Sequence, residues 1–280
     1  MRIRFLGTAA AEGVPGLGCT CEVCKRARAE KGHNIRTRHQ SIIDGELLID
    51  LPPDTFSHFI DNDIYLDRIR NLIVTHVHGD HFRTNEISMF RRGYNHVDED
   101  WQGLTVWGSK DVADAMQTML SDKSKNYLDK LDYEEMQPYK TYAIGNYTVT
   151  PLKAHHGTEN PFNYIISGDG KSILYLHDTG WPLDETLSFL GTVNKVFDLV
   201  TYDCTMGNTK GVTKGFCHMG LEMNVELRKW LEDAGKTDGH TVHVVNHFTH
   251  NAKNAGHDDM TRDAAALGFI ATYDGMEIEI

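Results

Sequence analysis

The sequence predicts an α/β (α+β) domain in which two mixed β-sheets pack together and helices cover their outer faces. Predicted strands and helices interleave along the whole length of the 280 residues. Several strands are joined by hairpins, for which Asp44-Gly45 is a turn signal, and a purely parallel sheet would not contain such hairpins. Because no low-complexity linker divides the chain, we expect a single domain over residues 1–280.

The first half of the chain alternates short apolar runs with polar segments. Residues 2–7 alternate apolar and polar side chains and stop at Gly7, which is typical of a strand. Ser109 is a candidate N-cap before a run of helix-forming residues. The predicted elements are strands at 2–7, 41–43, 46–49, 71–75 and 104–107, and helices at 22–31 and 109–120.

The second half shows the same interleaving. Apolar residues recur with a helical period over 219–234, at Leu221, Val225, Leu227, Trp230 and Leu231. The predicted strands are 147–152, 163–167, 172–176, 196–202, 241–245, 269–272 and 276–279. Helices are predicted at 182–190, 219–234 and near 259–267.

The net charge and the N-terminal segment limit which partners and which cellular compartment we expect. Acidic residues outnumber basic ones by 40 to 28, for a formal charge of -12, so a broad basic face for long nucleic acid is not expected. The first apolar run is short and broken by charges, so no signal peptide is predicted. No segment approaches the roughly 18 apolar residues of a membrane span, so we expect a cytoplasmic protein without a membrane partner.

Histidine is in excess, with 16 in the chain, and it is the commonest metal ligand. Three histidines stand in His76-Val77-His78-Gly79-Asp80-His81, directly after the apolar strand 71–75. Side chains diverge in a turn that leaves a strand, so one pair can face one metal while the other pair faces a second. Imidazole suits Zn, Mn and Fe, and a carboxylate suits the harder of these. The cluster therefore predicts a two-metal site rather than a histidine-rich surface loop.

One loop cannot complete two coordination shells, so further ligands must come from later strand ends. Three positions qualify because each follows an apolar strand: His155 or His156, Asp178, and His247. Each alone could equally be an ordinary loop residue, but with the first cluster they form a coherent series. A carboxylate can bridge two metals beside one hydroxide, which makes Asp178 the expected bridge.

Three of the five cysteines, Cys19, Cys21 and Cys24, fall within six residues. Disulfides are rare in a reducing cytosol, so this cluster predicts metal or redox chemistry in a loop at about residues 18–25. Three thiolates need a fourth ligand to close a tetrahedral zinc site, and a histidine elsewhere in the chain is the candidate. The alternative is three reduced thiols at a helix start. We interpret Cys204 and Cys217 as ordinary thiols.

The H-x-H-x-D-H cluster, with spaced His, Asp and His residues at later strand ends, resembles the metallo-β-lactamase superfamily. Within it, the chain is similar to the phosphoribosyl 1,2-cyclic phosphate phosphodiesterases of the carbon–phosphorus lyase pathway of phosphonate metabolism. The narrower resemblance rests on GTAAAEGVPGLGCTCEVC at 7–24, Leu48-Ile49-Asp50, Val149-Thr150-Pro151-Leu152, Asp178-Thr179 and Tyr273-Asp274-Gly275-Met276-Glu277-Ile278. It extends from the first strand to the last residues and implies an αββα sandwich.

The resemblance also implies a dinuclear site with two divalent ions, which would be Mn, Zn or Fe. The implied ligands are His76, His78 and His156 for one metal, Asp80, His81 and His247 for the other, and Asp178 as the bridge. His156 is preferred to His155 because the strand 149–152 then aligns without a gap. The stretch 157–162 is longer than in the family, and it borders the site, so it bears on substrate preference.

By the same resemblance, one structural zinc is held by Cys19, Cys21, Cys24 and His250. A catalytic histidine falls at His218, with Asp80 as a second catalytic residue. An alkoxide is a poor leaving group, so a protonated imidazole at His218 would be useful as a general acid. The alternative is a loop histidine without chemistry.

Other polar residues receive less specific interpretations. Asp50 is either an acceptor for a ligand imidazole or a turn residue, and His177 either lies behind the metals or points away. Arg91 and Arg92 could recognise phosphate, although a surface pair is more common. His243 is expected inside a strand. Six histidines in polar stretches are expected to be solvated: His33, His39, His58, His96, His240 and His257.

Together these observations predict a phosphodiesterase for a small cyclic phosphate ester, of the phosphoribosyl 1,2-cyclic phosphate or 2′,3′-cyclic nucleotide type. A metal-bridging hydroxide would attack phosphorus, and two divalent ions against Asp80 and Asp178 leave the pocket positive by about 2. One alternative is a tRNA 3′-end endonuclease, which the charge of -12 and the lack of a basic arm disfavour. Others are a lactam or thioester hydrolase and a non-catalytic zinc-stabilised binding module. The resemblance further implies a homodimer.

Overall fold

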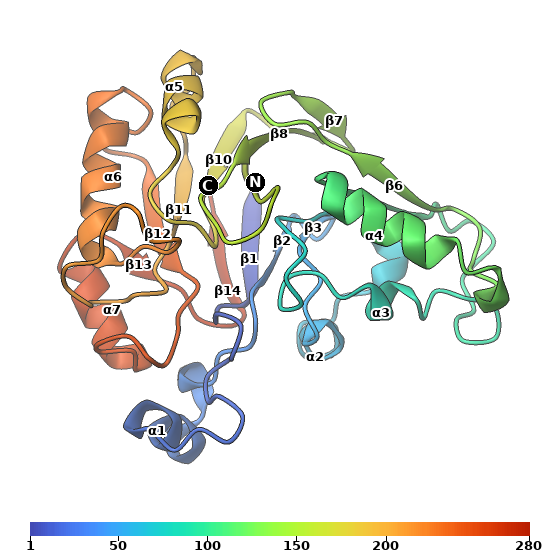
Figure 1. The fold of residues 1–280 in the computed structure, drawn as a ribbon, viewed down its shortest axis with the longest axis horizontal. Helices are drawn as coiled ribbons and strands as arrows, with labels where there is room; N and C mark the ends of the chain where they lie inside the picture. The colour runs from blue at the N-terminus through green and yellow to red at the C-terminus, as the bar shows by residue number, and fades with distance from the viewer.

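A computed structural model describes all residues from 1 to 280 and contains two seven-stranded mixed sheets (Figure 1). The first sheet has the order β14-β1-β2-β3-β4-β5-β6. Its strands are β1 (Arg2–Gly7), β2 (Gln40–Ile43), β3 (Leu47–Ile49), β4 (Asn71–Ile73), β5 (Leu104–Gly108), β6 (Leu131–Glu135) and β14 (Met276–Glu279). Pairs from β14 to β3 are antiparallel, and pairs from β3 to β6 are parallel.

The second sheet repeats this plan with the order β13-β12-β11-β10-β9-β8-β7. Pairs from β7 to β10 are antiparallel, and pairs from β10 to β13 are parallel. Its strands are β7 (Tyr142–Ile144), β8 (Tyr147–Lys153), β9 (Phe162–Gly168), β10 (Lys171–Tyr175), β11 (Leu199–Asp203), β12 (Val242–Asn246) and β13 (Ile270–Ala271).

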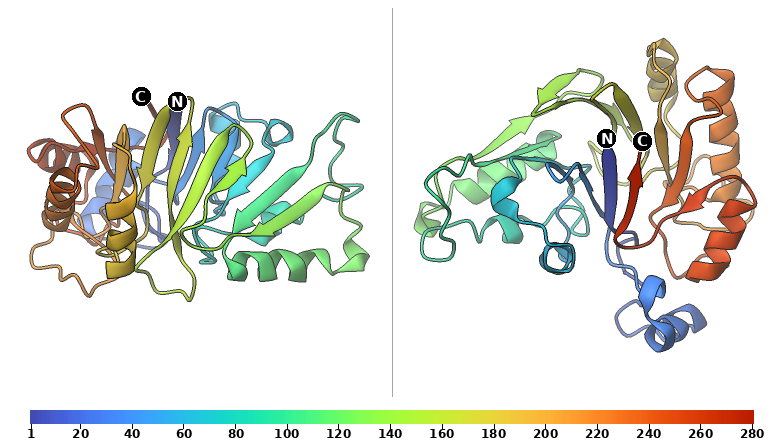
Figure 2. Two further views of the ribbon diagram at one scale, coloured as in Figure 1. Left: turned by 90° about the horizontal axis from the view of Figure 1, so that it is seen from above. Right: turned by 180° about the vertical axis from the view of Figure 1, so that it is seen from behind.

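Seven helices lie outside the sheets: α1 (Glu22–Glu30), α2 (Thr55–Asp61), α3 (Thr84–Ile87), α4 (Lys110–Leu120), α5 (Asp184–Thr192), α6 (Leu221–Asp233) and α7 (His257–Ala265). Helices α2 to α4 accompany the first sheet and α5 to α7 the second, whereas α1 projects with the N-terminal loop (Figures 1 and 2). The longest helix has 13 residues, and no helix combines the length and apolar character that crossing a membrane requires.

Three apolar clusters bind these layers together. The central cluster joins the facing sides of the sheets, with Phe5 and Ile49 from the first sheet and Tyr164 and Tyr175 from the second. Two outer clusters pack helices onto each sheet. Burying one such side chain contributes roughly 1.5–3 kcal/mol, so a chain of this composition gains most by covering both faces of each sheet. The predicted αββα sandwich is therefore confirmed.

Most predicted elements lie within a few residues of the observed ones, and the differences have local causes. Strands β6 and β7 and helices α2 and α3 were not predicted. β6 is an edge strand with the sequence LDYEE, and charged side chains suit an exposed edge but hide the strand pattern. Strand β11 begins at Leu199 rather than 196, because the backbone of Phe197 bonds to Lys236 instead of to a neighbouring strand.

The carboxyl ends of the parallel strands meet at one edge of the sandwich. Strands β3 and β4 of one sheet and β10 to β12 of the other deliver polar residues there, as expected for parallel strands. Asp50, Asp178 and His247 follow β3, β10 and β12, and each has a positive φ, of 65°, 48° and 65°. Such backbone conformations are costly for these residue types and cluster at functional sites.

Two histidines that we expected to be solvated are buried, which corrects that prediction. His39 is fully buried beneath the sheet edge, and His58 on α2 is 3% exposed. The ring of His58 hydrogen-bonds through Nδ1 to Gln40 Oε1 at 2.7 Å and through Nε2 to Thr37 Oγ1 at 2.6 Å. Both partners lie about 20 residues earlier in the chain, so the residues next to His58 in the sequence did not indicate its burial. His33, His96 and His240 are exposed as expected, and His257 is half-buried.

The burial of His58 predicts an acid-dependent loss of stability. Burial lowers the pKa of His58 to about 4, whereas the unfolded chain titrates at about 6.5. Because the folded pKa is depressed, its contribution is fully present above about pH 6.5 and is lost as pH falls toward 4, by up to about 3 kcal/mol. We expect urea unfolding of His58→Gln to lose less stability over this window than the wild type. The exposed His240→Gln should behave as wild type, and an unchanged pH profile for His58→Gln would contradict the prediction.

Candidate metal centre and active site

The loop after β4 places its polar residues at the meeting point of the strand ends. Its backbone makes one tight turn, in which the amides of His81 and Phe82 both bond to the carbonyl of His78, at 2.9 and 2.8 Å. Nε2 of His76 and Nε2 of His81 each lie 3.2 Å from Oδ2 of Asp178, which follows β10 of the other sheet. The two sheets therefore contribute to one site.

The potential ligand atoms form two groups that share one carboxylate. Within each group all ligand atoms lie within 4.8 Å of one another. The first group is His76, His78, His156 and Asp178, and the second is Asp80, His81, Asp178 and His247. These are the two sets that the sequence resemblance implied, with Asp178 common to both.

Of the two adjacent histidines after β8, only His156 belongs to these groups. Its Nδ1 lies 3.3 Å from Asp178 Oδ1, and its Nε2 lies 3.1 Å from His78 Nδ1. His155 is held away from them, because its Nδ1 lies 3.2 Å from the carbonyl of Trp181 and its backbone amide donates to Thr179 Oγ1.

Several buried atoms in these groups have no hydrogen-bond partner, which is the expected sign of cation ligands. They include Nε2 of His81, Nδ1 of His156 and Oδ1 of Asp178. Leaving such atoms unsatisfied costs about 1–3 kcal/mol each. A divalent cation between the imidazoles and carboxylates would satisfy them, and this donor set suits Zn, Mn or Fe. The residues therefore fit the ions that the sequence predicts.

Outer partners orient several of these side chains. Asp50 Oδ2 lies 2.8 Å from Nδ1 of His81, so the interpretation of Asp50 as an acceptor for an imidazole is confirmed. Thr205 Oγ1 lies 2.7 Å from Nδ1 of His247. Such partners fix the ring orientation and raise the basicity of a ligating imidazole. His177 lies behind the site, with its ring next to that of His39 and tilted by 31° to it.

Asp178 is the most heavily surrounded carboxylate, with 3% exposure. Burial alone would raise its pKa, but the nearby imidazoles of His247, His218, His76 and His81 hold the pKa of Asp178 well below its usual value. It is therefore ionised at neutral pH and available as an anionic bridge.

His218 contacts the carboxylate of Asp178 and a second carboxylate, that of Asp203. The sequence did not identify Asp203 as a site residue. Nδ1 of His218 is 3.2 Å from Asp178 Oδ1 and 3.4 Å from Asp203 Oδ2. Burial would lower the pKa of His218, but these two carboxylates raise it to about 11. Asp203 is fully buried at the end of β11 and accepts from the amides of Met219 and Thr205 at 2.9 and 3.0 Å. The sequence pattern that could have identified Asp203 is an Asp at the end of an apolar strand, which is the same pattern that identified Asp178.

The predicted structural zinc residues also meet. The ligand atoms of Cys19, Cys21, Cys24 and His250 lie within 4.8 Å of one another. Sγ of Cys21 and Sγ of Cys19 are 3.6 and 3.8 Å from His250 Nδ1, and none of the cysteines is in a disulfide. Three thiols and one imidazole match a closed tetrahedral zinc site. Cys204 is buried, as expected for an ordinary thiol, whereas the partly buried Cys217 has its thiol within 4.8 Å of ligand atoms of His156 and His218.

A cavity of about 420 Å³ opens over the two donor groups. Its lining residues are Ala10, Ala11, Glu12, His78, Asp80, His156, Asp178, Thr205, Met206, His218, His247, Thr249 and Asn251. None is Lys or Arg. Arg91 stacks on Tyr94 at 3.9 Å, and Arg92 pairs with Asp129 at 2.7 Å, so neither reaches this cavity.

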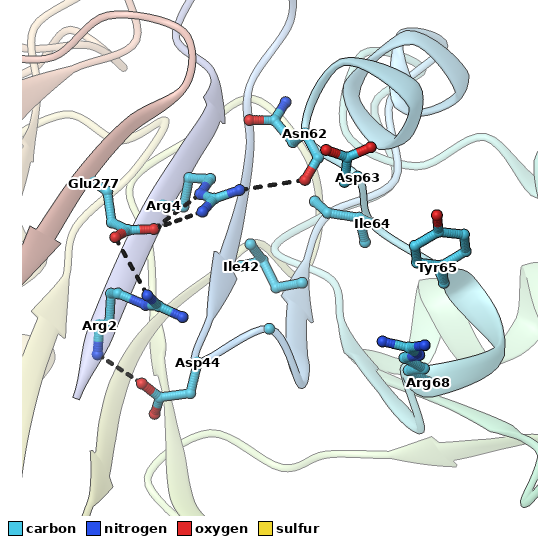
Figure 3. A pocket seen from close by; sticks show the side chains of 11 residues that line it. Arg2, Arg4, Ile42, Asp44, Asn62, Asp63, Ile64, Tyr65, Arg68 and Glu277 are labelled. Carbon is cyan, nitrogen blue, oxygen red and sulfur yellow. Dashed lines mark hydrogen bonds and ion pairs between the residues drawn. The ribbon is translucent and has the colours of Figure 1, made fainter.

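Two further cavities help to define the site. No residue of the stretch 157–162 lines the cavity over the donor groups; residues 158–162 line another cavity, of about 540 Å³, which shares His156 with it. Another, of about 250 Å³, lies near the start of β1, where Arg4 donates to Glu277 and to the carbonyl of Asn62 (Figure 3). It has no His or Cys in its lining, and its charged groups largely pair with one another, so it is not a metal site candidate.

Residues 47–244 match the family described as the beta-lactamase superfamily domain. This match covers more than half of the chain and most of the donor residues. The chain therefore belongs to the metallo-β-lactamase superfamily. Membership implies divalent metal ions, in agreement with the donor groups.

Two curated proteins share part of this sequence. One, named octanoyltransferase, from Porphyromonas gingivalis, is 28% identical over 178 residues, which are 59% of this chain and 33% of that protein. Another, named ribonuclease Z, from Listeria innocua, is 25% identical over 169 residues, 59% of this chain and 49% of that protein. The matches thus span between a third and a half of these relatives.

Solved structures share the whole fold. A diphosphatase from the PhnP family superposes with a TM-score of 0.73 and 20% identity over 100% of this chain and 98% of that chain. Zinc-bound PqqB from Methylobacterium extorquens gives a TM-score of 0.74 and 17% identity over 100% of both chains. At these identities the likeness establishes the fold alone.

Metal analysis tests the donor clusters separately. We expect about three divalent metals per chain, of which one resists mild chelation because a Cys₃His site is closed. Asp178→Ala should lose the two exchangeable metals but keep the resistant metal, and its unfolding temperature should change little. Cys21→Ser should lose the resistant metal and unfold at a lower temperature, because metal binding there is coupled to folding. One metal per wild-type chain would contradict the two-site arrangement.

Proposed function

We propose that this chain is a dinuclear metal hydrolase that cleaves a small cyclic phosphate diester, of the phosphoribosyl 1,2-cyclic phosphate or 2′,3′-cyclic nucleotide type. The observation that carries the proposal is the position of His218 between Asp178 and Asp203, in the cavity that holds the donor groups. A histidine between two carboxylates stays protonated, and a proton beside the donors serves a reaction that expels a poor leaving group. A thioester does not need such an acid, because a thiolate leaves readily.

The proposed ligands follow the two donor groups. One metal would be held by His76, His78 and His156 and the other by Asp80, His81 and His247, and the carboxylate of Asp178 belongs to both groups. When bound, two divalent ions neutralise charge on the phosphoryl oxygens and lower the pKa of a bound water. Mn, Zn and Fe all suit these ligands, whereas the thiols of the Cys₃His cluster suit a structural zinc.

The protein groups orient the water and supply the proton. Burial alone would raise the pKa of Asp80, but its ion pair with His81 holds that pKa well below its usual value. Asp80 therefore stays ionised and can accept a hydrogen bond from the attacking water. Nδ1 of His218 is held by carboxylates, so Nε2 is the atom that donates a proton to the departing alkoxide. Asp203 remains as the anionic partner of the ring when cations share the charge of Asp178.

A second candidate is the processing of tRNA 3′ ends, which the 25% identity to a protein named ribonuclease Z favours. Such a reaction needs a grip on a long polyanion, and phosphate contacts from Lys and Arg normally provide it. The charge of -12 and a cavity without Lys or Arg argue against this candidate.

Leaving-group dependence tests the role of His218. We expect His218→Ala to lower kcat for an alkyl cyclic phosphate about 10²–10⁴-fold, the range of general acid catalysis. Hydrolysis of bis(p-nitrophenyl) phosphate should fall much less, because p-nitrophenolate leaves without a proton. His155→Ala, which removes a neighbouring histidine outside the donor groups, is the matched control. Equal losses on both substrates, with metal content unchanged, would remove the acid role.

A hydrolysis panel tests the substrate class. We expect the highest kcat/KM for ribose 1,2-cyclic phosphate or a 2′,3′-cyclic nucleotide, since one phosphodiester and a small leaving group suit the cavity. The panel also includes a thioester, a β-lactam and a precursor tRNA. Asp178→Ala should abolish every activity that belongs to the site and so identifies contaminating enzymes. A precursor tRNA, lactam or thioester as the best substrate would refute the proposal.

A further inference from the structure

A third cluster of potential ligand atoms lies beside the candidate metal centre and includes a cysteine. The thiol of Cys217 and one ring nitrogen each of His156 and His218 lie within 4.8 Å of one another. The side chains of His156 and His218 are 6% and 20% exposed, and Cys217 is partly buried. In the proposed reaction the two histidines act separately, and Cys217 has no role.

The loop that carries Cys217 is held in place on both sides of the cysteine. After it, the amide of Met219 donates to the buried carboxylate of Asp203 at 2.9 Å. Before it, the carbonyl of Phe216 packs so closely against Gly180 that a Cβ atom at position 180 would have no room. Because a cysteine side chain has a single rotatable bond to its sulfur, this fixed backbone keeps the thiol beside the two imidazoles.

Each of the two imidazoles has a nitrogen that remains available to a further cation. Nε2 of His156 lies 3.1 Å from Nδ1 of His78, in the first donor group, whereas Nδ1 of His156 is buried and has no hydrogen-bond partner. Nδ1 of His218 faces the carboxylates of Asp178 and Asp203, and its Nε2 makes no hydrogen bond to the protein. A cation beside Cys217 would therefore meet one sulfur and two nitrogen donors.

This donor set selects among cations. A thiolate with two imidazoles suits Zn²⁺, whereas Mn²⁺ prefers carboxylate and water ligands. Three protein ligands with a fourth position left for water is a normal zinc coordination. Ligands must lose their protons to bind, so the cation would replace the thiol proton of Cys217 and the ring protons on Nε2 of His218 and Nδ1 of His156. Because this replacement costs free energy, the site should fill only when Zn²⁺ is in excess.

We propose that Cys217, His218 and His156 form an inhibitory Zn²⁺ site, which takes up a further cation beside the dinuclear centre and so displaces the proton of His218. The binding follows from the donor geometry, whereas its effect on turnover rests on the proposed function, in which Nε2 of His218 protonates the departing alkoxide. A chain with Zn²⁺ at this site would keep the metals of the dinuclear centre but lose its general acid. Excess zinc would therefore inhibit the enzyme, and excess manganese would not.

A cobalt titration tests the binding without turnover. The starting protein carries zinc at the Cys₃His cluster and Mn²⁺ at the dinuclear centre. Co²⁺ is the probe, because cobalt bound to a thiolate gives an ultraviolet charge-transfer band that imidazole and carboxylate ligands do not give. We expect this band in the wild type and in His155→Ala, the matched control, and we expect Cys217→Ser to lose it. No band in the wild type, or the same band in Cys217→Ser, would refute the site.

Zinc inhibition tests the consequence for turnover of an alkyl cyclic phosphate in saturating Mn²⁺, with each variant compared with its own rate in Mn²⁺ alone. Cys217→Ser should raise the Zn²⁺ concentration for half-inhibition at least about tenfold, since even the loss of a group behind a ligand costs about 10–100-fold in metal affinity. Exchange of Zn²⁺ into the dinuclear centre would affect every variant alike, so His155→Ala should respond as the wild type does. Equal sensitivity of Cys217→Ser and the wild type would overturn the inhibitory role.

The two measurements separate this inference from the proposed function. If the cobalt band depends on Cys217 but no cyclic ester is hydrolysed, the proposed function fails and the metal site stands. If cyclic esters are hydrolysed but the wild type shows no cobalt band, the metal site is refuted and the proposed function stands.

Discussion

The buried carboxylate of Asp178 is the constraint on which the site depends. It is 3% exposed, and imidazole nitrogens of His76, His81, His156 and His218 lie within 3.2–3.3 Å of it. An uncompensated buried charge costs several kcal/mol, so the fold must bring these positive or metal-binding partners to one point. They come from loops of both sheets, which explains why the sheets pack with their carboxyl strand ends together. It also explains the positive φ of Asp178, since the backbone bends to aim the carboxylate at them.

The candidate active site and the cysteine cluster are parts of one structure. His247 and His250 stand three residues apart on the loop after β12, and each belongs to a different donor cluster. The segment between them also bonds to the N-terminal loop, through the amides of Ala10 and Phe248. Buried Arg36 also contacts this region: its guanidinium donates a hydrogen bond to the Thr272 carbonyl at 2.6 Å and stacks on the ring of Phe248. A metal at the cysteines would thus hold one wall of the catalytic cavity in place.

Charge is distributed so that attraction for an anion is local. The chain carries a formal charge of -12, no Lys or Arg lines the cavity, and Lys153 and Lys214 pair with carboxylates. Divalent ions on the donor groups, together with His218, would therefore supply most of the positive potential that a phosphate ester meets. Relatives on this fold include proteins named as a diphosphatase and as ribonuclease Z. The fold thus places the donor groups of this chain, whereas the residues around the cavity decide what reaches them.

The sequence by itself determined the sandwich and most of the donor residues. Strand and helix periods, the H-x-H-x-D-H motif and the cysteine spacing are local patterns, and the resemblance assigned distant residues such as Asp178 and His250. Only the tertiary structure separated His156 from His155, because adjacent side chains differ in direction rather than in type. Only the tertiary structure shows that Asp203 contacts His218 and that His39 and His58 are buried, because these contacts join segments far apart in the chain. Charge partners and burial depend on three-dimensional proximity, which residue order does not record.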